Sequence, residues 1–373
     1  MKKPVLLVVM DGVGFSKTGL GDAVSLANTP TLDHLLATYP NVKLKAHGSA
    51  VGLPSDDDMG NSEVGHNALG CGQIYSQGAK LVNESIESGK IYESSSWKEV
   101  VNNALTHNST VHFIGLLSDG NVHSNISHLI SMLKEVKKSG VTKARVHVLL
   151  DGRDVPATSA LVYINQLEEA LAALNDASFD GRIASGGGRM KITMDRYQAN
   201  WKMVEDGWNT HVLGNARKFA SAEEAINTYR SENEGIIDQD LPAFVIAENC
   251  EPVGRIVNHD SVVLFNFRGD RAIELSRSFD EEKFDKFDRI RVPNVMYAGM
   301  LQYDADANIP KRFLTEPPKI TNTLTEELCK YNIREYAVRE TQKYGHVTYF
   351  WNGNRASKFN EELETYVEIP SDN

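Results

Sequence analysis

Short runs of apolar residues recur along the chain, and most of them alternate with segments of helical pattern. Six such runs occupy residues 5–10, 111–117, 146–150, 262–267, 295–301 and 347–350. Strands that are buried on both faces have nearly continuous apolar sequences of this kind, whereas half-exposed strands alternate apolar and polar residues. The pattern therefore predicts an α/β fold with a mostly parallel sheet that helices cover on both faces.

Two segments between these runs have the periodicity of amphipathic helices. Apolar residues recur at helical spacing over residues 126–136, and Gly140 follows the end of the pattern. A second helix is predicted at residues 159–174, and residues 358–366 also have a helix-like pattern. In a parallel sheet ligands bind at the carboxyl ends of the strands, so polar residues directly after the apolar runs are the first candidates for a site.

Length and composition set limits on the organisation and on the partners. A chain of 373 residues exceeds what one core usually supports, which predicts about two domains. A net charge of −11 argues against a nucleic-acid or membrane-surface partner, and no stretch has the roughly 18 apolar residues of a membrane span. Three scattered cysteines form no disulfide or CxxC pattern, which favours the cytoplasm. Breaks in periodicity at residues 72–78 and 304–318 indicate domain boundaries.

Asp11 follows the first apolar run directly and precedes Gly12. Its carboxylate should emerge at the carboxyl end of a strand, where a metal ligand is plausible. The other interpretation is a turn-forming Asp-Gly pair.

Ser62 lies between Gly60 and Gly65, in a turn that opens a predicted helix. Backbone N–H groups and the helix dipole at such a position favour an anion on the serine hydroxyl. The alternative is an N-cap serine, although Gly65 stands where a capping-box glutamate would be expected. As a nucleophile, the hydroxyl would need a base or a metal to lower its pKa.

Seven segments together resemble one known family. They are Val8–Gly14, Gly60–His66, Leu117–Ser124, Asp151–Asp154, Met194–Arg196, Phe265–Arg271 and Glu340–Thr348. Their order and spacing are similar to those of the cofactor-independent phosphoglycerate mutases of the alkaline phosphatase superfamily. Each segment alone is weak evidence for this family, but seven segments in the same order and spacing over nearly the whole chain are hard to obtain by chance.

The resemblance implies an enzyme of glycolysis and gluconeogenesis that interconverts 3-phosphoglycerate and 2-phosphoglycerate without added 2,3-bisphosphoglycerate. Ser62 would be bound to metal and would carry the phosphoryl group as a phosphoserine, with Asp11 and Ser62 as metal ligands. Two divalent ions are implied, usually Mn²⁺, with Mg²⁺ or Co²⁺ as alternatives. Metals and arginines suit this reaction because phosphoryl transfer needs positioning and charge neutralisation. A monomer is the family's usual state.

The same resemblance implies roles for further residues. Asp154 matches the general acid and base, and Lys343 matches the lysine that reaches toward the phosphoryl group. Taken singly, Asp154 could instead form an ion pair with a neighbouring arginine, and Lys343 could be a solvated surface charge. A turn at residues 186–188 would bring Arg189 close. The implied substrate-binding residues are His123, Arg153, Asp154, Arg189, Arg196, Arg268, Arg271 and Lys343; forked guanidinium groups suit a carboxylate and a phosphate.

The resemblance also predicts the domain layout. Residues 1–75 and 311–373 would form an alkaline-phosphatase-like domain, and residues 76–310 a second α/β phosphotransferase domain inserted into it. The family's phosphatase domain is longer than the part matched by this chain, and its other metal ligands, a D-x-x-x-H arrangement, an Asp-His pair and a further His, have no match. We therefore expect a fragment, truncated at its C-terminus, that binds metal weakly and is inactive alone.

Two other functions fit the same residues. One is another metal-dependent phosphomutase or phosphatase of the superfamily, such as a phosphopentomutase, although the matches in residues 76–310 favour the mutase. The other is a non-catalytic phosphoglycerate-binding module. Several histidines match none of the motifs and have no assigned role: His34, His47, His107, His112, His128, His147, His211 and His259.

Overall fold

The fold is known from a computed structural model, in which the chain forms two separate compact units. It describes residues 3–10, 13–14, 19–53, 56, 60, 62–76, 78–196, 198–304, 307–316, 320–355 and 357–370, without the side chains of residues 62, 63 and 342. The first unit is Met1–Lys45 and the second is Ala46–Asn373. We describe each unit by itself.

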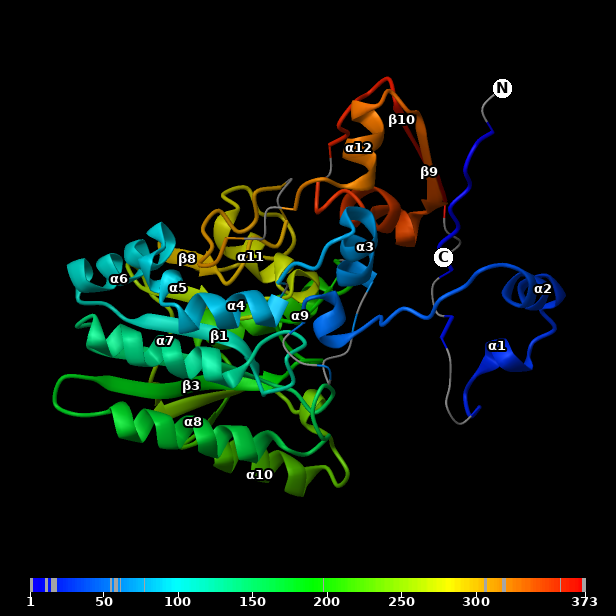
Figure 1. The fold of residues 1–373 in the computed structure, drawn as a ribbon. Helices are drawn as coiled ribbons and strands as arrows, with labels where there is room; N and C mark the ends of the chain where they lie inside the picture. Colours follow the sequence, from blue (N-terminus) through cyan, green and yellow to red (C-terminus); the bar gives the residue numbers. More distant parts are fainter. Residues whose placement is uncertain are drawn as a thin grey trace. The chain divides into compact units, whose positions relative to one another are not determined.

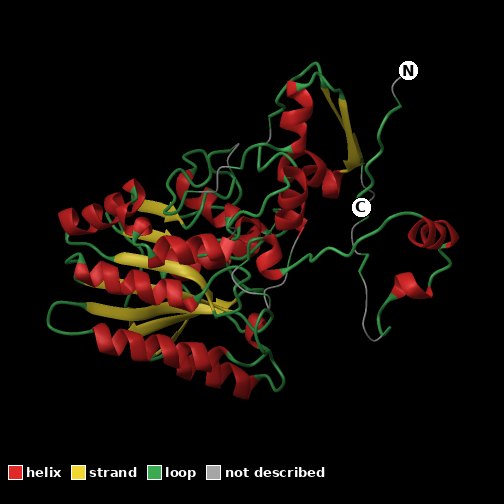
Figure 2. Ribbon diagram, in the orientation of Figure 1, coloured by secondary structure: helices red, strands yellow, loops and turns green. Residues whose placement is uncertain are grey.

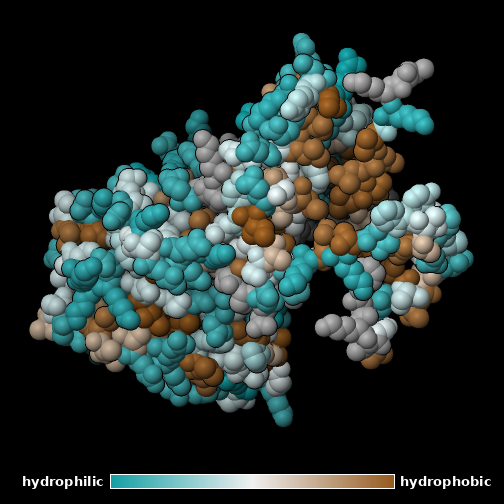
Figure 3. Space-filling model, viewed as in Figure 1, coloured by the Kyte–Doolittle hydropathy of each residue, from teal (hydrophilic) through white to brown (hydrophobic). Residues whose placement is uncertain are grey.

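The first unit contains two short helices, α1 (Ala23–Leu26) and α2 (Pro30–Thr38), and no strand among its described residues. The predicted buried strand at residues 5–10 is therefore wrong. These residues have no strand partner within the described structure, and all their side chains except Val9 are exposed, with Val5 96% exposed. Figure 3 shows apolar surface at this segment. An inner strand needs neighbours that bond its backbone N–H and C=O groups, and the described part of this unit supplies none.

The second unit contains a large sheet that is mostly parallel, as predicted (Figure 1). Its strand order is β4-β5-β3-β2-β1-β7-β8, with β6 paired to β5. Only the β3–β5 and β5–β6 pairs are antiparallel among the described strands. The strands are β1 (Val111–Leu117), β2 (Lys143–Leu150), β3 (Asp180–Gly188), β4 (Arg217–Phe219), β5 (Phe244–Glu248), β6 (Glu251–Pro252), β7 (Ser261–Leu264) and β8 (Met296–Gly299).

Helices cover both faces of this sheet, and each face has its own hydrophobic cluster (Figure 2). Neighbouring residues of β1 alternate between them: Phe113 belongs to the cluster with α4–α8 and α10, and Ile114 to the cluster with α9 and α11. The predicted helices 126–136 and 159–174 are confirmed as α7 and α8. The bounds are α4 (Gly78–Glu87), α5 (Lys90–Glu93), α6 (Ser95–His107), α7 (Ile126–Lys138), α8 (Ala160–Leu174), α9 (Trp201–Trp208), α10 (Ala222–Glu232) and α11 (Ile273–Asp280).

The rest of the second unit lies before α4 and after residue 320 in the sequence. It contains α3 (Ser62–Cys71), α12 (Leu324–Lys330) and a two-stranded parallel sheet of β9 (Glu335–Glu340) and β10 (Glu364–Ile369). Short helical turns are η1 (Gly48–Val51), η2 (Asn209–Leu213), η3 (Asp238–Asp240), η4 (Gly269–Arg271), η5 (Thr341–Lys343) and η6 (His346–Phe350). Among the residues that the structure describes, no helix is long and apolar enough to cross a membrane.

Three local predictions fail in the second unit. The apolar run 347–350 belongs to the helical turn η6, and part of the predicted helix 358–366 is strand β10. Gly186, Gly187 and Gly188 end strand β3 instead of forming a turn. They are glycines because other backbone atoms approach closely: a Cβ on Gly188 would lie 2.3 Å from the carbonyl oxygen of Gln239. Tertiary packing, which local sequence does not display, decides all three.

Candidate active site

Four neighbouring parallel strands end at one edge of the main sheet, and polar segments follow each of them. In sheet order β3, β2, β1, β7, these segments are residues 189–196, 151–154, 118–125 and 265–271. Carboxyl ends of parallel strands share an edge, so the four segments lie side by side. They carry every predicted substrate-binding residue except Lys343.

Asp151 organises the first turn after β2 and is buried. Its Oδ1 accepts hydrogen bonds from the backbone N–H groups of Arg153, at 3.2 Å, and Asp154, at 3.1 Å. Its Oδ2 accepts one from the Ser118 hydroxyl at 2.6 Å, which links the ends of β1 and β2. The Arg189 guanidinium donates to Oδ1 at 2.8 Å from the end of β3. One carboxylate thus fixes three strand ends.

Arg189 is almost fully buried and contacts two carboxylates. Its Nη1 lies 2.8 Å from Asp151 Oδ1 and 2.5 Å from Asp154 Oδ2. Its Nε is buried and has no hydrogen-bond partner in the described part of the chain. An unpaired donor on a buried cation is costly, so this atom is a natural contact for an anionic ligand.

His123 lies at the centre of a group of arginines. Burial and then the positive charges of Arg189, Arg268, Arg271 and Arg153 lower the pKa of His123 to about 2. The ring is therefore neutral at physiological pH, and its Nδ1 is 3.8 Å from Asp270 Oδ1, too far for a hydrogen bond. The convergence of so many cations on one imidazole indicates a field that attracts anions.

Arg271 completes the inner part of this group. It is buried, and its Nη1 donates to the carbonyl oxygen of Met194 at 2.5 Å. Burial, and then the charges of Arg189, Arg196 and Arg153, lower the pKa of Arg271 below its usual value. A like-charged environment of this kind costs free energy until an anion enters it.

The arginines differ in depth, which suggests two kinds of contact. Arg189 and Arg271 are buried, Arg268 is half-buried, and Arg153 and Arg196 are exposed. Arg268 also pairs with Asp270, at 3.1 Å. Buried, preorganised guanidinium groups suit bidentate binding of a carboxylate or phosphate, and the exposed ones can close over it. We call residues 123, 153, 154, 189, 196, 268 and 271 the arginine cluster.

A second group of predicted residues surrounds helix α3. Ser62 begins this helix, and Lys343 ends the turn η5, just before η6. Helix α3 packs against η6: the His66 and His346 rings are 5.1 Å apart, and a Cβ on Gly70 would meet the Trp351 carbonyl oxygen at 2.0 Å. The structure therefore brings the helix of Ser62 next to the segment that follows Lys343.

The predicted metal ligands are not tested by this geometry. Asp11 lies outside the described residues, and the Ser62 side chain is likewise outside them. The part of the chain that the structure describes contains no group of three or more His, Cys, Asp or Glu side chains that could hold a metal ion. The described residues thus do not fit a complete metal site.

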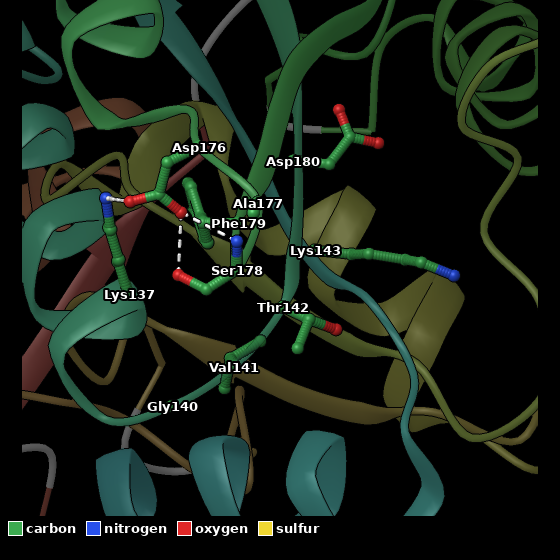
Figure 4. A pocket seen from close by; sticks show the side chains of 10 residues that line it. All are labelled: Lys137, Gly140, Val141, Thr142, Lys143, Asp176, Ala177, Ser178, Phe179 and Asp180. Carbon is green, nitrogen blue, oxygen red and sulfur yellow. Dashed lines mark hydrogen bonds and ion pairs between the residues drawn. The ribbon is translucent and has the colours of Figure 1, made fainter.

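A shallow pocket lies where strands β2 and β3 begin, at the opposite edge of the main sheet from the arginine cluster. Lys143 begins β2 and Asp180 begins β3, so the pocket that they line is at the amino ends of strands whose carboxyl ends carry the arginine cluster (Figure 4). Its best-defined interaction is the Lys137–Asp176 ion pair at 2.6 Å. Asp176 is half exposed, and solvated surface pairs of this kind are common. This pocket does not share residues with the predicted site.

Sequence reasoning missed residues that hold the cluster in place. Three of them, Asp151, Ser118 and Asp270, lie in the segments that resemble the family, but no role was predicted for these residues. Asp151 gave one available signal, because it directly follows an apolar run in the sequence. The carbonyl of Met194 gave none, since a backbone contact to a residue 77 positions away has no trace in local sequence.

Comparison with known proteins identifies the family of this chain. A family model described as the N-terminus of BPG-independent phosphoglycerate mutase matches residues 82–305. A probable 2,3-bisphosphoglycerate-independent phosphoglycerate mutase of Leptospira interrogans is 56% identical over 99% of this chain and 68% of its own length. The chain belongs to this family. Its fold class and its nature as an enzyme of the phosphoglycerate mutase family are thereby established.

Further members of the family support the assignment. The 2,3-bisphosphoglycerate-independent phosphoglycerate mutase of Trypanosoma brucei brucei is 51% identical over the whole chain and 68% of its own length. A solved structure of Leishmania mexicana phosphoglycerate mutase, at low cobalt concentration, superposes with a TM-score of 0.86 at 49% identity, covering 98% of this chain and 67% of that one. The chain thus spans about two thirds of the length of its relatives. The domain boundaries at 75/76 and 310/311 stay a prediction.

Proposed function

We propose that this chain binds phosphoglycerate and takes part in its isomerisation between 3-phosphoglycerate and 2-phosphoglycerate. The observation that carries the proposal is the arginine cluster: cations from the ends of β2, β3 and β7 converge on a neutral His123, which follows β1. A phosphoglycerate has a carboxylate and a phosphate, and this cluster supplies more guanidinium groups than one anion requires. The family membership narrows the anion to this substrate.

In this proposal the arginines hold the substrate and Asp154 moves its protons. Arg189 donates to Oδ2 of Asp154 at 2.5 Å, which fixes the carboxylate and would leave its second oxygen for a substrate hydroxyl. Asp154 gives a proton to the glycerate oxygen when the phosphoryl group leaves. It then removes the proton from the other hydroxyl, which takes the phosphoryl group back.

Ser62 is the proposed carrier of the phosphoryl group between these two steps. Its position at the first residue of α3 supports the proposal, because the N-terminus of a helix stabilises an anion. Lys343 is proposed to contact the same phosphoryl group, which is supported by the packing of η6 on α3. Both assignments rest on the family motifs and not on described contacts of the Ser62 side chain.

Metal dependence belongs to the same proposal. Two divalent ions, with Mn²⁺ as the first candidate, would neutralise phosphoryl charge, and Asp11 and Ser62 would contribute to their coordination. The low-cobalt structure of the Leishmania relative is consistent with a divalent ion in the family. We assign no step to the metal, because the described residues do not form a site for it. The family name implies that 2,3-bisphosphoglycerate is not required.

The remaining predictions concern the setting of the enzyme. The three cysteines are free, which supports a cytoplasmic location. A monomer without a nucleic-acid or membrane partner stays our expectation, with phosphoglycerate as the ligand.

Calorimetric titration of the 373-residue chain with 3-phosphoglycerate tests the binding step. We expect saturable binding, and we expect inorganic phosphate to bind more weakly because it lacks the carboxylate. No heat of binding for 3-phosphoglycerate would contradict the proposal. Turnover is measured separately, with manganese and without 2,3-bisphosphoglycerate; any turnover should be lost in Ser62→Ala while binding persists. Binding without turnover in the unaltered chain would identify it as a binding module.

A further inference from the structure

Three histidines without an assigned role lie in one buried chain of hydrogen bonds below the arginine cluster. His112 is on β1, His147 is on β2 and His211 is in η2, and all three are almost fully buried. Ser185 of β3 lies between His147 and His211. The chain begins at Asp260, just before β7, and ends at Thr193, in the segment that follows β3.

The distances along this chain are those of ordinary hydrogen bonds. Asp260 Oδ2 is 3.1 Å from His112 Nε2, and His112 Nδ1 is 2.9 Å from His147 Nε2. His147 Nδ1 is 2.7 Å from the Ser185 hydroxyl. That hydroxyl is 2.8 Å from His211 Nδ1, and His211 Nε2 is 3.0 Å from the Thr193 hydroxyl. Six side chains from five parts of the unit are thus connected without interruption.

The carboxylate at one end fixes the direction of every hydrogen bond. Asp260 accepts hydrogen bonds from the backbone N–H groups of Thr110, at 3.0 Å, and Val257, at 2.8 Å. Burial opposes its charge, but the hydrogen bond from His112 and these N–H groups lower the pKa of Asp260 overall. It is therefore an ionised acceptor, and His112 Nε2 must carry a proton. Since His112 is neutral, its Nδ1 must accept.

Each further side chain in this row of hydrogen bonds has its proton fixed by the neighbour before it. His147 donates from Nε2 to His112 and accepts at Nδ1 from the Ser185 hydroxyl. Ser185 in turn accepts from Nδ1–H of His211, whose Nε2 accepts from the Thr193 hydroxyl. Burial, the largest effect in each case, lowers the pKa of all three histidines, that of His211 to about 3, so the rings are neutral. Only one arrangement of protons satisfies every bond.

A bulge in the sheet makes the chain possible. In the β2–β3 pair Val146 is opposite Ile183, but His147 is opposite Ser185, so the register shifts by one residue. Without this extra residue His147 would face Ala184, which has no hydroxyl. Bulges re-aim side chains in this way, and here the bulge inserts the serine that joins two imidazoles.

The last residue of the chain connects it to the arginine cluster. Thr193 has φ 70°, a conformation that is strained for a β-branched residue and persists only where its surroundings hold it. Two contacts hold it: the hydrogen bond to His211, and its N–H, which donates to the Met203 carbonyl at 2.8 Å. The next residue, Met194, accepts the hydrogen bond from buried Arg271, and Arg196 follows two positions later.

We propose that Asp260, His112, His147, Ser185, His211 and Thr193 form a positioning relay that holds the 193–196 segment, and through it Arg271 and Arg196, in the geometry that binds phosphoglycerate. The relay itself stands on the hydrogen bonds alone; its effect on phosphoglycerate rests on the proposed function. The relay touches no substrate, and its residues act through Thr193 and Met194.

Nitrogen NMR of histidine-labelled protein tests the relay directly, with resonances assigned from single His→Gln variants. We expect neutral rings at pH 7, with the proton on Nε2 in His112 and His147 and on Nδ1 in His211. In Ser185→Ala the chain of hydrogen bonds should be interrupted between His147 and His211. His112 and His147 should keep their tautomers, and His211 should become free to carry its proton on Nε2. A cationic ring, or Nε2–H on His211 in the unaltered chain, would overturn the relay.

Titration with 3-phosphoglycerate tests the coupling. Ser185→Ala should weaken binding by about tenfold, the size of one lost buried hydrogen-bond link. Ser276→Ala is the matched control, because this buried serine also has two partners, Ala272 O and Tyr297, in the same hydrophobic cluster. Ser276→Ala should lower the melting temperature, as Ser185→Ala should, but it should bind 3-phosphoglycerate with unchanged affinity. Thr193→Val, which lacks the hydroxyl, should also weaken the binding of 3-phosphoglycerate. Thr193→Ser, which keeps the hydroxyl, should bind with the affinity of the unaltered chain.

The outcomes separate the two proposals. If both serine variants bind alike, the relay has only a structural role and the coupling is wrong. If the unaltered chain does not bind 3-phosphoglycerate, the proposed function and the coupling fail together, while the histidine tautomers still decide whether the relay exists.

Discussion

Arg271 shows how a single side chain joins fold and ligand. Its guanidinium uses Nη1 to bind the Met194 carbonyl, and the planar fork has further N–H donors that can bind an anion. A lysine at this position keeps the charge but has no planar fork, so it cannot bind the carbonyl and an anion in the same geometry. The residue is therefore expected to matter by its shape as well as its charge.

Arg271→Lys should weaken 3-phosphoglycerate binding by about tenfold or more, because one charge-assisted hydrogen bond is lost. Arg277→Lys is the control, since Arg277 in the following helix α11 pairs with Glu281 at 2.6 Å, outside the cluster. Calorimetric titration of both variants measures the difference. Equal affinities would remove Arg271 from the binding site.

At the scale of secondary-structure elements, sequence predicted the centre of the sheet well and its periphery poorly. The run 111–117 coincides with β1, because a parallel strand buried on both faces is continuously apolar. Strand β3 was missed, because its last residues are glycines that read as a turn. Residues 5–10 and 347–350 have the same apolar character as β1, yet the described structure gives them no strand partners. Apolar content indicates burial, and pairing depends on what lies alongside.

Gly188→Ala tests the close approach that ends β3. The new Cβ would lie 2.3 Å from Gln239 O and 2.5 Å from Gln239 C, both backbone atoms that cannot rotate away. We expect a loss of about 2–3 kcal/mol in the free energy of unfolding. Urea denaturation measures it.

Gly65→Ala serves as the comparison for Gly188→Ala. A Cβ on Gly65 meets no atom within 4 Å, and the residue is inside helix α3. Alanine there should be neutral or stabilise by up to about 1 kcal/mol. If Gly188→Ala were equally harmless, the backbone of η3 would have to be far more compliant than its packing against β3 indicates.

At the scale of the whole second unit, sequence proposed the residues of the arginine cluster but not the hydrogen-bond network that supports them. His123, Arg153 and Arg268 come after predicted apolar runs, and the order of those strands brings them to one edge. Arg189 and Arg196 follow β3, which was not predicted. The relay joins residues as distant in sequence as His112 and Asp260, 148 positions apart, through contacts that have no spacing rule. Its histidines look, in sequence, like any others. Only the assembled sheet, with its bulge, shows that they form one chain.

The buried histidines also predict how the whole molecule responds to acid. Burial is the largest effect that lowers the pKa of His128, to about 4, and of His211, to about 3, against about 6.5 in an unfolded chain. Below pH 6.5 the unfolded state therefore binds protons that the folded state refuses. Stability is full above pH 6.5 and falls as the pH drops toward the folded values, by up to about 1.4 kcal/mol per pH unit for each histidine.

His128→Gln isolates one of these contributions, because His128 belongs neither to the relay nor to the arginine cluster. Buried acids such as Glu274 and Asp280, whose pKa burial raises, act in the opposite direction, so the total slope is a balance. The difference between the variant and the unaltered chain removes that balance. Urea denaturation between pH 6.5 and 4.5 should give a slope that is shallower in the variant by up to about 1.4 kcal/mol per pH unit. Parallel slopes would mean that His128 is protonated in the folded chain, which its burial against Phe267 opposes.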